Sequence, residues 1–182
     1  MTLTKRIYPD QTIGIIGGGQ LGKMLAQSAL RMGYKVAVLD PSEDAPASAT
    51  SHLFINAPFD DAQALKQLGD ASDVITYEFE NIDGPLLEEM VDEYYVPQGA
   101  DTLLTLQNRE DEKDAIRNSG AKVVPFEKVE SDEDVKAFTA KENYPVIVKT
   151  ATGGYDGKGQ YLIESEADLE DETIPYLSLI HI

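Results

Sequence analysis

The chain has 182 residues, 42% of them hydrophobic and 26% charged, which is enough to bury the core of one ordinary domain or of two small ones. A formal net charge of -18 without any basic run argues against binding to nucleic acids or to membrane surfaces, because both require clustered cations. The sequence has no cysteine, no apolar leader and no apolar run near the ~20 residues of a membrane span, which indicates a cytoplasmic protein without disulfides or thiolate chemistry.

The first half of the chain alternates strand and helix signals. Short apolar runs predict strands at 12–16, 35–39, 52–56 and 73–77. Helical periodicity, caps and a first-turn proline predict helices at 20–32, 60–68 and 85–92. One face of the first helix carries Leu21, Met24, Leu25, Ser28, Ala29 and Met32. This order predicts an α/β fold, with a Rossmann-like parallel sheet covered by helices on both faces.

The segment Val-Pro-Gln-Gly at 96–99 breaks this alternation and suggests a first domain over residues 1–98. Two helices are predicted beyond it, at 101–107 and 109–118, and a third at 131–141 with Ser131 and Asp134 forming a near capping box. Strands are predicted at 123–125, 145–149 and 160–163. The pattern is typical of a small α+β lid subdomain, which we assign to residues 99–176.

Residues 17–22, with the sequence GGGQLG, match the pattern G-x-G-x-x-G between a strand and a helix. Asp40 ends the next strand, where a ribose-binding acid of a dinucleotide site is found. Glycines at such a turn let an anion approach the free N–H groups of the helix. Three interpretations remain open: an NAD site of a Rossmann oxidoreductase, a tight turn without a ligand, and a phosphate site for another substrate.

The segment Tyr-Glu-Phe-Glu-Asn at 77–81 lies at the carboxyl end of the fourth predicted strand, where ligands bind in open parallel sheets. Strand alternation places Glu78 and Glu80 on one side, with Tyr77 and Phe79 on the other. A carboxylate at this position could hold a hydroxyl or an amine of a substrate. A solvated strand end is the alternative.

The strand predicted at 145–149 ends in Lys149 and leads into a glycine-rich loop at 153–160. Backbone N–H groups of such a loop can enclose phosphates, and Lys149, Lys158 and Arg109 can add positive charge. One cation about 4 Å from one phosphate charge contributes about 4 kcal/mol at an effective dielectric constant near 20. The loop is not a Walker A motif, because no Gly-Lys-Ser/Thr opens a helix. We therefore interpret it as a nucleotide-phosphate loop, with a solvated hairpin as the alternative.

The segments 17–24, 77–81 and 153–160 together resemble the N5-carboxyaminoimidazole ribonucleotide synthetases of the ATP-grasp superfamily, over about residues 12–164. The resemblance implies a pre-ATP-grasp domain, an ATP-grasp lid and a large carboxyl ATP-grasp domain. It also implies a ligase of purine biosynthesis that uses ATP, Mg2+ and bicarbonate to carboxylate 5-aminoimidazole ribonucleotide, releasing ADP and phosphate. The formate-dependent glycinamide ribonucleotide transformylases share the first motif more loosely.

The resemblance also implies roles for individual residues. Substrate contacts would come from Gly19, Gln20, Leu21 and Glu78. Nucleotide contacts would come from Arg109, Lys149, Gly153, Gly154, Gly157, Gly159 and Gln160. The catalytic contacts to substrate or bicarbonate would come from Tyr155, Asp156 and Lys158. In this reading the first glycine turn holds the substrate phosphate, and Asp40 has no ribose to bind.

The family continues well beyond residue 182, and its magnesium-binding glutamates lie in that later part. We therefore expect the carboxyl ATP-grasp domain to be missing here, residues 177–182 to be an atypical tail, and the 182-residue chain to be inactive alone. Ribonucleotide-dependent ATP hydrolysis by this chain would contradict that expectation. A homodimer of the full-length protein is compatible with the resemblance. A non-catalytic nucleotide-binding module is the remaining alternative.

Overall fold

The computed structural model describes residues 5–153, 159–171 and 178–181, and the chain forms two compact units, Met1–Leu103 and Leu104–Ile182. The division falls within helix α4 (Asp101–Gln107) rather than at the predicted boundary after residue 98. The reason is packing, because Val96, Ala100 and Leu103 are all at least 94% buried. The residues directly after the predicted break therefore still belong to the core of the first unit.

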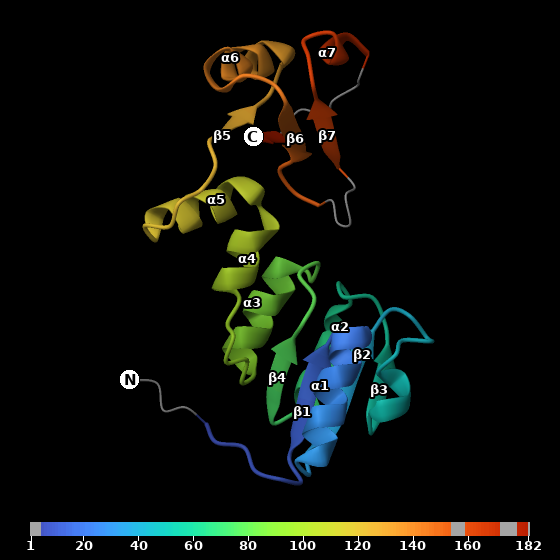
Figure 1. The fold of residues 1–182 in the computed structure, drawn as a ribbon. Coiled ribbons are helices and arrows are strands. Elements are labelled where there is room, and N and C mark those ends of the chain that lie inside the picture. The colour runs from blue at the N-terminus through green and yellow to red at the C-terminus, as the bar shows by residue number, and fades with distance from the viewer. Residues whose placement is uncertain (1–4, 154–158, 172–177, 182) are drawn as a thin grey trace. The chain divides into compact units, whose positions relative to one another are not determined.

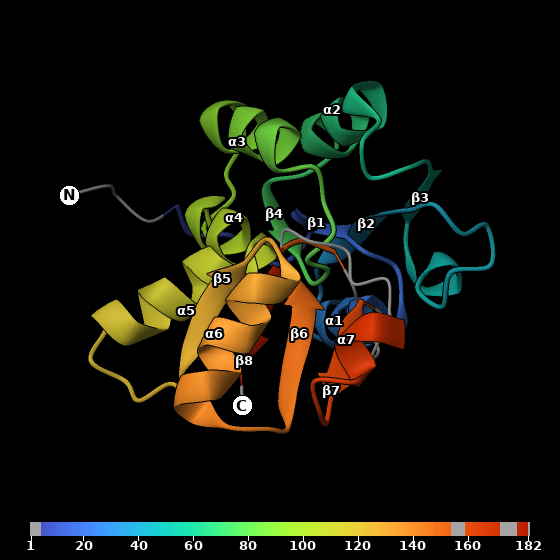
Figure 2. The same cartoon turned by 90° about the horizontal axis from the view of Figure 1, so that it is seen from above.

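The first unit contains a four-stranded parallel sheet with the order β3-β2-β1-β4 (Figure 1). Its strands are β1 (Thr12–Ile16), β2 (Lys35–Asp40), β3 (Leu53–Asn56) and β4 (Val74–Tyr77). Helix α1 (Gln20–Arg31) covers one face, and α2 (Ala62–Asp70) and α3 (Gly84–Glu93) cover the other (Figure 2). The predicted Rossmann-like sheet is confirmed, and a short 3-10 helix η1 (Ser48–Thr50) precedes β3.

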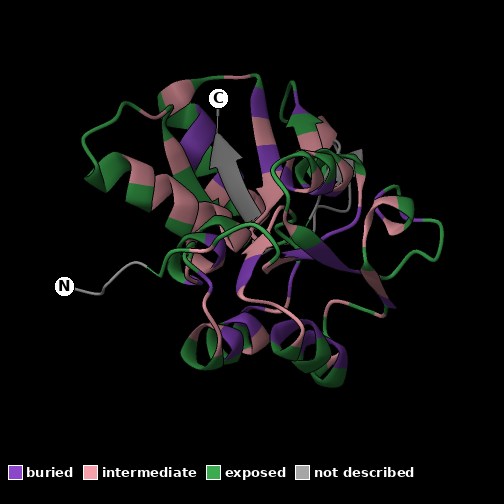
Figure 3. Cartoon of the chain, turned by 90° about the horizontal axis from the view of Figure 1, so that it is seen from below, coloured by how far each residue is buried: buried purple, intermediate pink, exposed green. Residues whose placement is uncertain are grey.

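The centre of this sheet, in β2 and the second half of β1, is buried on both faces, as expected when helices cover both sides of a parallel sheet. Figure 3 shows the buried residues in purple along the strands, and in β2 the whole run from Val36 to Leu39 is fully buried. Asp61 caps α2 and Asp83 caps α3, each through a side-chain oxygen that accepts backbone N–H groups. In the described part of the chain, no helix combines the length and the apolar character needed to cross a membrane.

The apolar face of α1 that the sequence suggested is not the face that packs on the sheet. The exposed fractions of Leu21, Met24, Leu25 and Met32 are 58%, 56%, 42% and 60%. Gly22 and Ala26 are buried, together with Ala29, which is the one buried member of the predicted face. A Cβ atom on Gly22 would lie 2.1 Å from the carbonyl oxygen of Gly17, so only glycine fits this contact. That contact sets the rotation of the helix, because residues four and seven positions later then share the inward face.

Two substitutions in α1 test this rotation. We expect Met24→Ala to change the free energy of unfolding by less than about 0.5 kcal/mol, because most of the side chain is in water. We expect Ala26→Leu to lower it by about 1–3 kcal/mol, because the added atoms overpack a fully buried position. Urea unfolding followed by circular dichroism measures both, and a larger loss for Met24→Ala would mean that the helix is rotated differently.

The second unit is built on an antiparallel sheet with the order β5-β8-β6-β7. Its strands are β5 (Phe126–Val129), β6 (Val146–Thr150), β7 (Gln160–Ile163) and β8 (Ser178–His181). Its helices are α4 together with α5 (Arg109–Asn118), α6 (Asp132–Glu142) and α7 (Asp168–Asp171). Most of the segment that we expected to be an atypical tail is thus a strand, β8, which pairs with both β5 and β6.

The strand predicted at 123–125 is wrong, because the ladder with β8 begins at Phe126. Pro125 has no N–H group to contribute to a ladder, which is consistent with a strand that starts after it. The predicted cap of α6 is confirmed. The hydroxyl oxygen of Ser131 accepts the N–H of Asp134 at 3.3 Å, and the carboxylate of Asp134 accepts the N–H of Glu130 at 2.9 Å.

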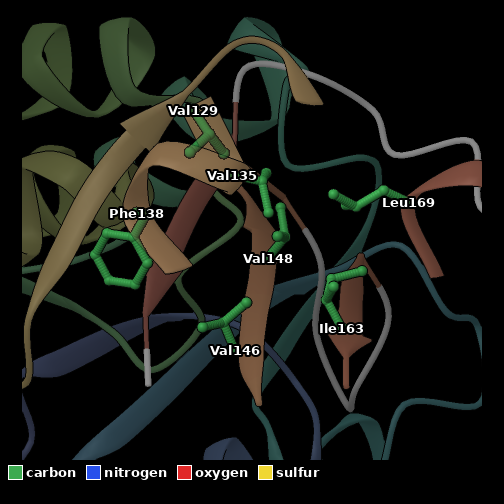
Figure 4. Packing of buried hydrophobic residues seen from close by; sticks show 7 residues of the cluster. All are labelled: Val129, Val135, Phe138, Val146, Val148, Ile163 and Leu169. Carbon is green, nitrogen blue, oxygen red and sulfur yellow. The ribbon is translucent and has the colours of Figure 1, made fainter. Parts of the chain in front are cut away.

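A single apolar cluster forms the core of the second unit between α6, α7 and the strands (Figure 4). It consists of Val129, Val135, Phe138, Val146, Val148, Ile163 and Leu169. Phe138 is the largest of the fully buried side chains. Since this core includes residues on β6 and β7, it holds in place the two strands that flank the glycine-rich loop.

Candidate functional site

The glycine turn at 17–19 connects β1 to α1, and its backbone conformation requires glycine at position 17. Gly17 has a φ of +105°, and a Cβ atom on it would lie 2.8 Å from Oε1 of Glu78. Gly19 is the N-cap residue of α1 and offers no side chain to cap the helix. The first and last glycines of the pattern, Gly17 and Gly22, are therefore explained here by the fold, whether or not the turn binds a ligand.

Two carboxylates of the protein accept hydrogen bonds from backbone N–H groups in this turn and at the start of α1. Oδ2 of Asp40 accepts the N–H of Gly18 at 2.7 Å, and Oδ1 accepts the N–H of Ser42 at 2.8 Å. The carboxylate of Glu78 accepts the N–H of Gly22, at the first turn of α1. The turn thus already binds two carboxylates of the protein, one at the end of β2 and one directly after β4.

This arrangement is unfavourable for a phosphate at the same position. The end of a helix attracts an anion by about 0.3–1 kcal/mol. A unit negative charge about 4 Å from one carboxylate is repelled by about 4 kcal/mol at an effective dielectric constant near 20. The repulsion exceeds the attraction, so the glycine turn as folded suits a hydrogen-bond donor better than an anion.

The environment of Glu78 favours its neutral form more than water does. Burial raises the pKa of the Glu78 carboxyl, the negative charge of Asp40 raises it further, and the hydrogen bond from Gly22 opposes both. A carboxylate that has lost water in this way gains when a ligand brings an N–H or O–H donor to it. An amine or a hydroxyl of a ligand would therefore be favoured beside Glu78, and this role stays a prediction.

The residues on either side of Glu78 serve the fold. The hydroxyl of Tyr77 donates to the carbonyl oxygen of Gly99 at 3.0 Å, and burial raises the pKa of that hydroxyl. The ring of Phe79 lies 5.3 Å from that of Phe59, centroid to centroid. The side chains of these two neighbours thus have partners of their own, while the Glu78 carboxylate lies against Gly17 and Gly19.

An open pocket of about 510 Å³ lies at the carboxyl edge of the same sheet. Its lining comes from the loops that follow β2, β3 and β4 and consists of Pro41, Pro58, Phe59, Asp60, Asn81, Ile82 and Asp83. Open parallel sheets bind their ligands outside the carboxyl ends of the strands. The first unit therefore has both a turn with a desolvated carboxylate and open space at the edge where such ligands bind.

The structure brings together all four predicted substrate contacts. Gly19, Gln20 and Leu21 form the start of α1, and both Gln20 and Leu21 are exposed. A Cβ atom on Gly19 would lie 3.5 Å from Oε1 of Glu78, so the carboxylate is adjacent to this end of the helix. These residues can contact one ligand at the same time, although their role as substrate contacts stays a prediction.

In the second unit, Arg109 binds the backbone that leaves β6. Its Nη1 atom donates to the carbonyl oxygens of Thr150 at 2.5 Å and of Gly153 at 2.7 Å. Its own N–H donates to the carbonyl oxygen of Ala151 at 2.9 Å. The guanidinium therefore braces the first residues of the glycine-rich loop, a role that the sequence did not indicate.

Lys149 and Gln160 lie opposite each other in the ladder between β6 and β7. The N–H of Thr150 donates to the carbonyl oxygen of Gly159 at 2.9 Å, and both Gly153 and Gly159 have positive φ angles. Five of the predicted positions lie outside the described residues: Gly154, Tyr155, Asp156, Gly157 and Lys158. Among the residues that are described, no group of three or more His, Cys, Asp or Glu side chains could hold a metal ion.

Sequence reasoning missed the function of Asp40 within the turn. Its place at the end of the second strand was a visible signal, but that spacing is equally typical of a ribose-binding acid. Both of its carboxylate oxygens accept backbone N–H groups, from Gly18 and Ser42. Only the folded loop shows that the side chain turns toward the glycines.

Comparisons with known proteins agree with this geometry. Residues 10–107 match the family described as the ribonucleotide synthetase preATP-grasp domain, and residues 114–176 match the ATP-grasp domain. The N5-carboxyaminoimidazole ribonucleotide synthase of Staphylococcus aureus (strain MRSA252) is 55% identical over 160 residues, which cover 88% of this chain and 43% of that protein. The crystal structure of the Staphylococcus aureus N5-carboxyaminoimidazole synthetase complexed with ADP has a TM-score of 0.91 and 49% identity, over 97% of this chain and 48% of that one.

A more distant structure is that of the Aspergillus clavatus N5-carboxyaminoimidazole synthase in complex with ADP and 5-aminoimidazole ribonucleotide. It has a TM-score of 0.82 and 25% identity, and the match covers 96% of this chain and 47% of that one. The chain thus spans less than half the length of these relatives. The predicted resemblance to the N5-carboxyaminoimidazole ribonucleotide synthetases is confirmed, and the chain belongs to the ribonucleotide synthetase preATP-grasp family, with a matching ATP-grasp segment after it.

Proposed function

We propose that the protein to which this chain corresponds carboxylates 5-aminoimidazole ribonucleotide with bicarbonate, at the expense of ATP, as a ligase of purine biosynthesis in the cytoplasm. The observation that carries the proposal is the 55% identity to a synthase of this activity, in a match that covers 88% of this chain. In support, the relative from Aspergillus clavatus was crystallised with ADP and 5-aminoimidazole ribonucleotide. ATP is thus the proposed nucleotide and the aminoimidazole ribonucleotide the proposed acceptor.

The reaction divides into two transfers. An oxygen of bicarbonate attacks the γ-phosphorus of ATP, ADP leaves, and carboxyphosphate forms. The substrate amine then attacks the carboxyl carbon, the C–N bond forms, inorganic phosphate leaves and the amine loses a proton. The protein contributes mainly by positioning the reactants and by neutralising charge, as in other phosphoryl transfers.

The second unit would supply the nucleotide contacts. Lys149 lies at the base of the glycine-rich loop, and Arg109 braces the same end of that loop. We assign Gly153, Gly159 and Gln160 to the same contact surface, together with Gly154 and Gly157, which lie outside the described residues. Tyr155, Asp156 and Lys158 keep their proposed contacts to substrate or bicarbonate. Mg2+ would neutralise charge on the transferred phosphate, and we propose its ligands in the part of the longer relatives that this chain does not cover rather than among the described residues.

The oxidoreductase alternative loses its main support. A dinucleotide site uses the acid after the second strand to bind ribose hydroxyls. In this structure both oxygens of Asp40 accept backbone N–H groups of Gly18 and Ser42, so the side chain is already engaged. Mixing the protein with NADH should therefore give no enhancement of NADH fluorescence.

The test of the proposed function is an ATPase assay on a chain with the full length of the relatives. We expect ADP release that requires both 5-aminoimidazole ribonucleotide and bicarbonate. Release of ADP with neither present, or a requirement for a different acceptor, would contradict the assignment. Sedimentation of the same protein checks whether it is a homodimer, which we propose only for that longer chain.

A further inference from the structure

Asp40 connects three loops at the carboxyl edge of the first sheet. Its carboxylate binds Gly18 in the turn after β1 and Ser42 in the loop after β2. Its own carbonyl oxygen accepts from the side chain of Asn56 at 3.0 Å and from the N–H of Ala57 at 3.3 Å, at the end of β3. One residue thus sets the relative positions of the three loop starts beside the pocket.

The peptide groups of Gly18 are held from both sides. The carboxylate of Asp40 accepts the N–H of Gly18, and the carbonyl oxygen of Gly18 accepts the N–H of Ala47 at 2.9 Å. A Cβ atom on Gly18 would lie 2.9 Å from the Cβ of Asp40, so the two residues are in direct contact. Gly17 and Gly19 both lie next to the Glu78 carboxylate. Because Gly18 lies between them, its hydrogen bonds also fix the backbone against which that carboxylate packs.

From this geometry we propose that Asp40 is a positioning residue with two effects. Its carboxylate prevents phosphate from binding at the glycine turn, which we call closure of the turn, and its hydrogen bond to Gly18 holds the turn in the conformation that positions Glu78. The turn then receives the amine or hydroxyl donors of a ribonucleotide, and the phosphate of that ligand lies elsewhere. This replaces the expectation that the turn holds the substrate phosphate. The part that concerns the ribonucleotide rests on the proposed function, whereas closure to phosphate does not.

The first test measures phosphate binding directly, with inorganic phosphate as the probe. In two-dimensional ¹⁵N NMR spectra of the 182-residue chain, phosphate should leave the amide signals of Gly18 and Gly22 unchanged. A saturable shift of either signal in the unsubstituted chain would overturn the closure of the turn. This outcome does not depend on which reaction the protein catalyses.

The second test separates positioning from general stability, in the full-length protein. Asp40→Ala should raise the KM for 5-aminoimidazole ribonucleotide about tenfold, which corresponds to losing one charge-assisted hydrogen bond, with the KM for ATP unchanged. Asp40→Asn keeps one oxygen that can accept an N–H, so it should restore part of the affinity.

Asp61→Ala is the matched control, because Asp61 also accepts two backbone N–H groups in the same unit, at the N-terminus of α2. It should lower thermal stability without changing either KM. Equal changes in both KM values for Asp40→Ala, or the same rise for Asp61→Ala, would overturn the positioning role. An absence of ribonucleotide-dependent turnover in the unsubstituted protein would instead reject the proposed function, and the phosphate experiment would still decide the closure.

Discussion

Replacing Glu78 by glutamine is expected to raise the KM for 5-aminoimidazole ribonucleotide by about 10- to 100-fold in the full-length protein. The carboxylate faces the start of α1 and has lost part of its hydration, so a donor from the ligand would make a charge-assisted hydrogen bond with it. Such bonds contribute about 1.5–3 kcal/mol. Steady-state kinetics with varied ribonucleotide at saturating ATP measures the change, and an unaltered KM would remove Glu78 from the site.

The same substitution is expected to stabilise the protein at neutral pH, because it removes a carboxylate whose charged form is disfavoured in the folded chain. The pKa of Glu78 is raised above its ordinary 4.5 in the folded state, so the folded chain holds this proton more tightly than the unfolded chain. The free energy of unfolding therefore falls as the pH rises from 4.5 through the raised pKa. Above that pKa the loss of stability stays constant. Glutamine carries no such cost, because it does not ionise.

Urea unfolding at neutral pH and near pH 4 measures this difference. The advantage of Glu78→Gln over the unsubstituted chain should shrink as the pH is lowered, since protonated Glu78 resembles glutamine. Glu88→Gln, on the exposed side of α3, is the matched control and should show no such pattern. A loss of stability for Glu78→Gln at neutral pH would mean that the carboxylate contributes more to the fold than it costs.

The second large effect is expected for Lys149→Ala, which should lower kcat for ATP hydrolysis by about 100- to 1000-fold, the range found when one preorganised charge-stabilising donor is removed. Lys149 lies near the end of β6, where the residues that Arg109 braces begin the glycine-rich loop. The KM for the ribonucleotide should change by less than about twofold if the lysine acts on the nucleotide alone. A parallel rise in that KM would show that the assignment to ATP is wrong.

Lys141→Ala is the matched control for this experiment. Lys141 belongs to the same unit and pairs with Glu127 at 3.0 Å on the surface. Exposed ion pairs contribute about 0–1 kcal/mol, so its removal should leave kcat unchanged. A similar loss of activity in both variants would indicate a general effect of positive charge rather than a contact at Lys149.

The elements of the first unit could be predicted because their signals are local. The apolar runs of β1 and β2, the capping of α2 and the proline in the first turn of α3 each depend on neighbours in the chain. The bounds predicted for α4 and α5 agree with the structure for the same reason. In contrast, β5 was placed too early, because its extent depends on pairing with β8, about 50 residues later.

The sequence by itself determined the family, the order of strands and helices in the first unit and the location of both glycine segments, because these follow from local periodicity and from short motifs. Only the tertiary structure decided which face of α1 is buried, since that depends on the contact between Gly22 and Gly17. Only the tertiary structure turned Asp40 toward Gly18 and Arg109 toward Thr150 and Gly153. The contacts of Asp40 and Arg109 join groups that lie far apart in the chain and meet only when the sheets have formed, so no spacing in the sequence encodes them.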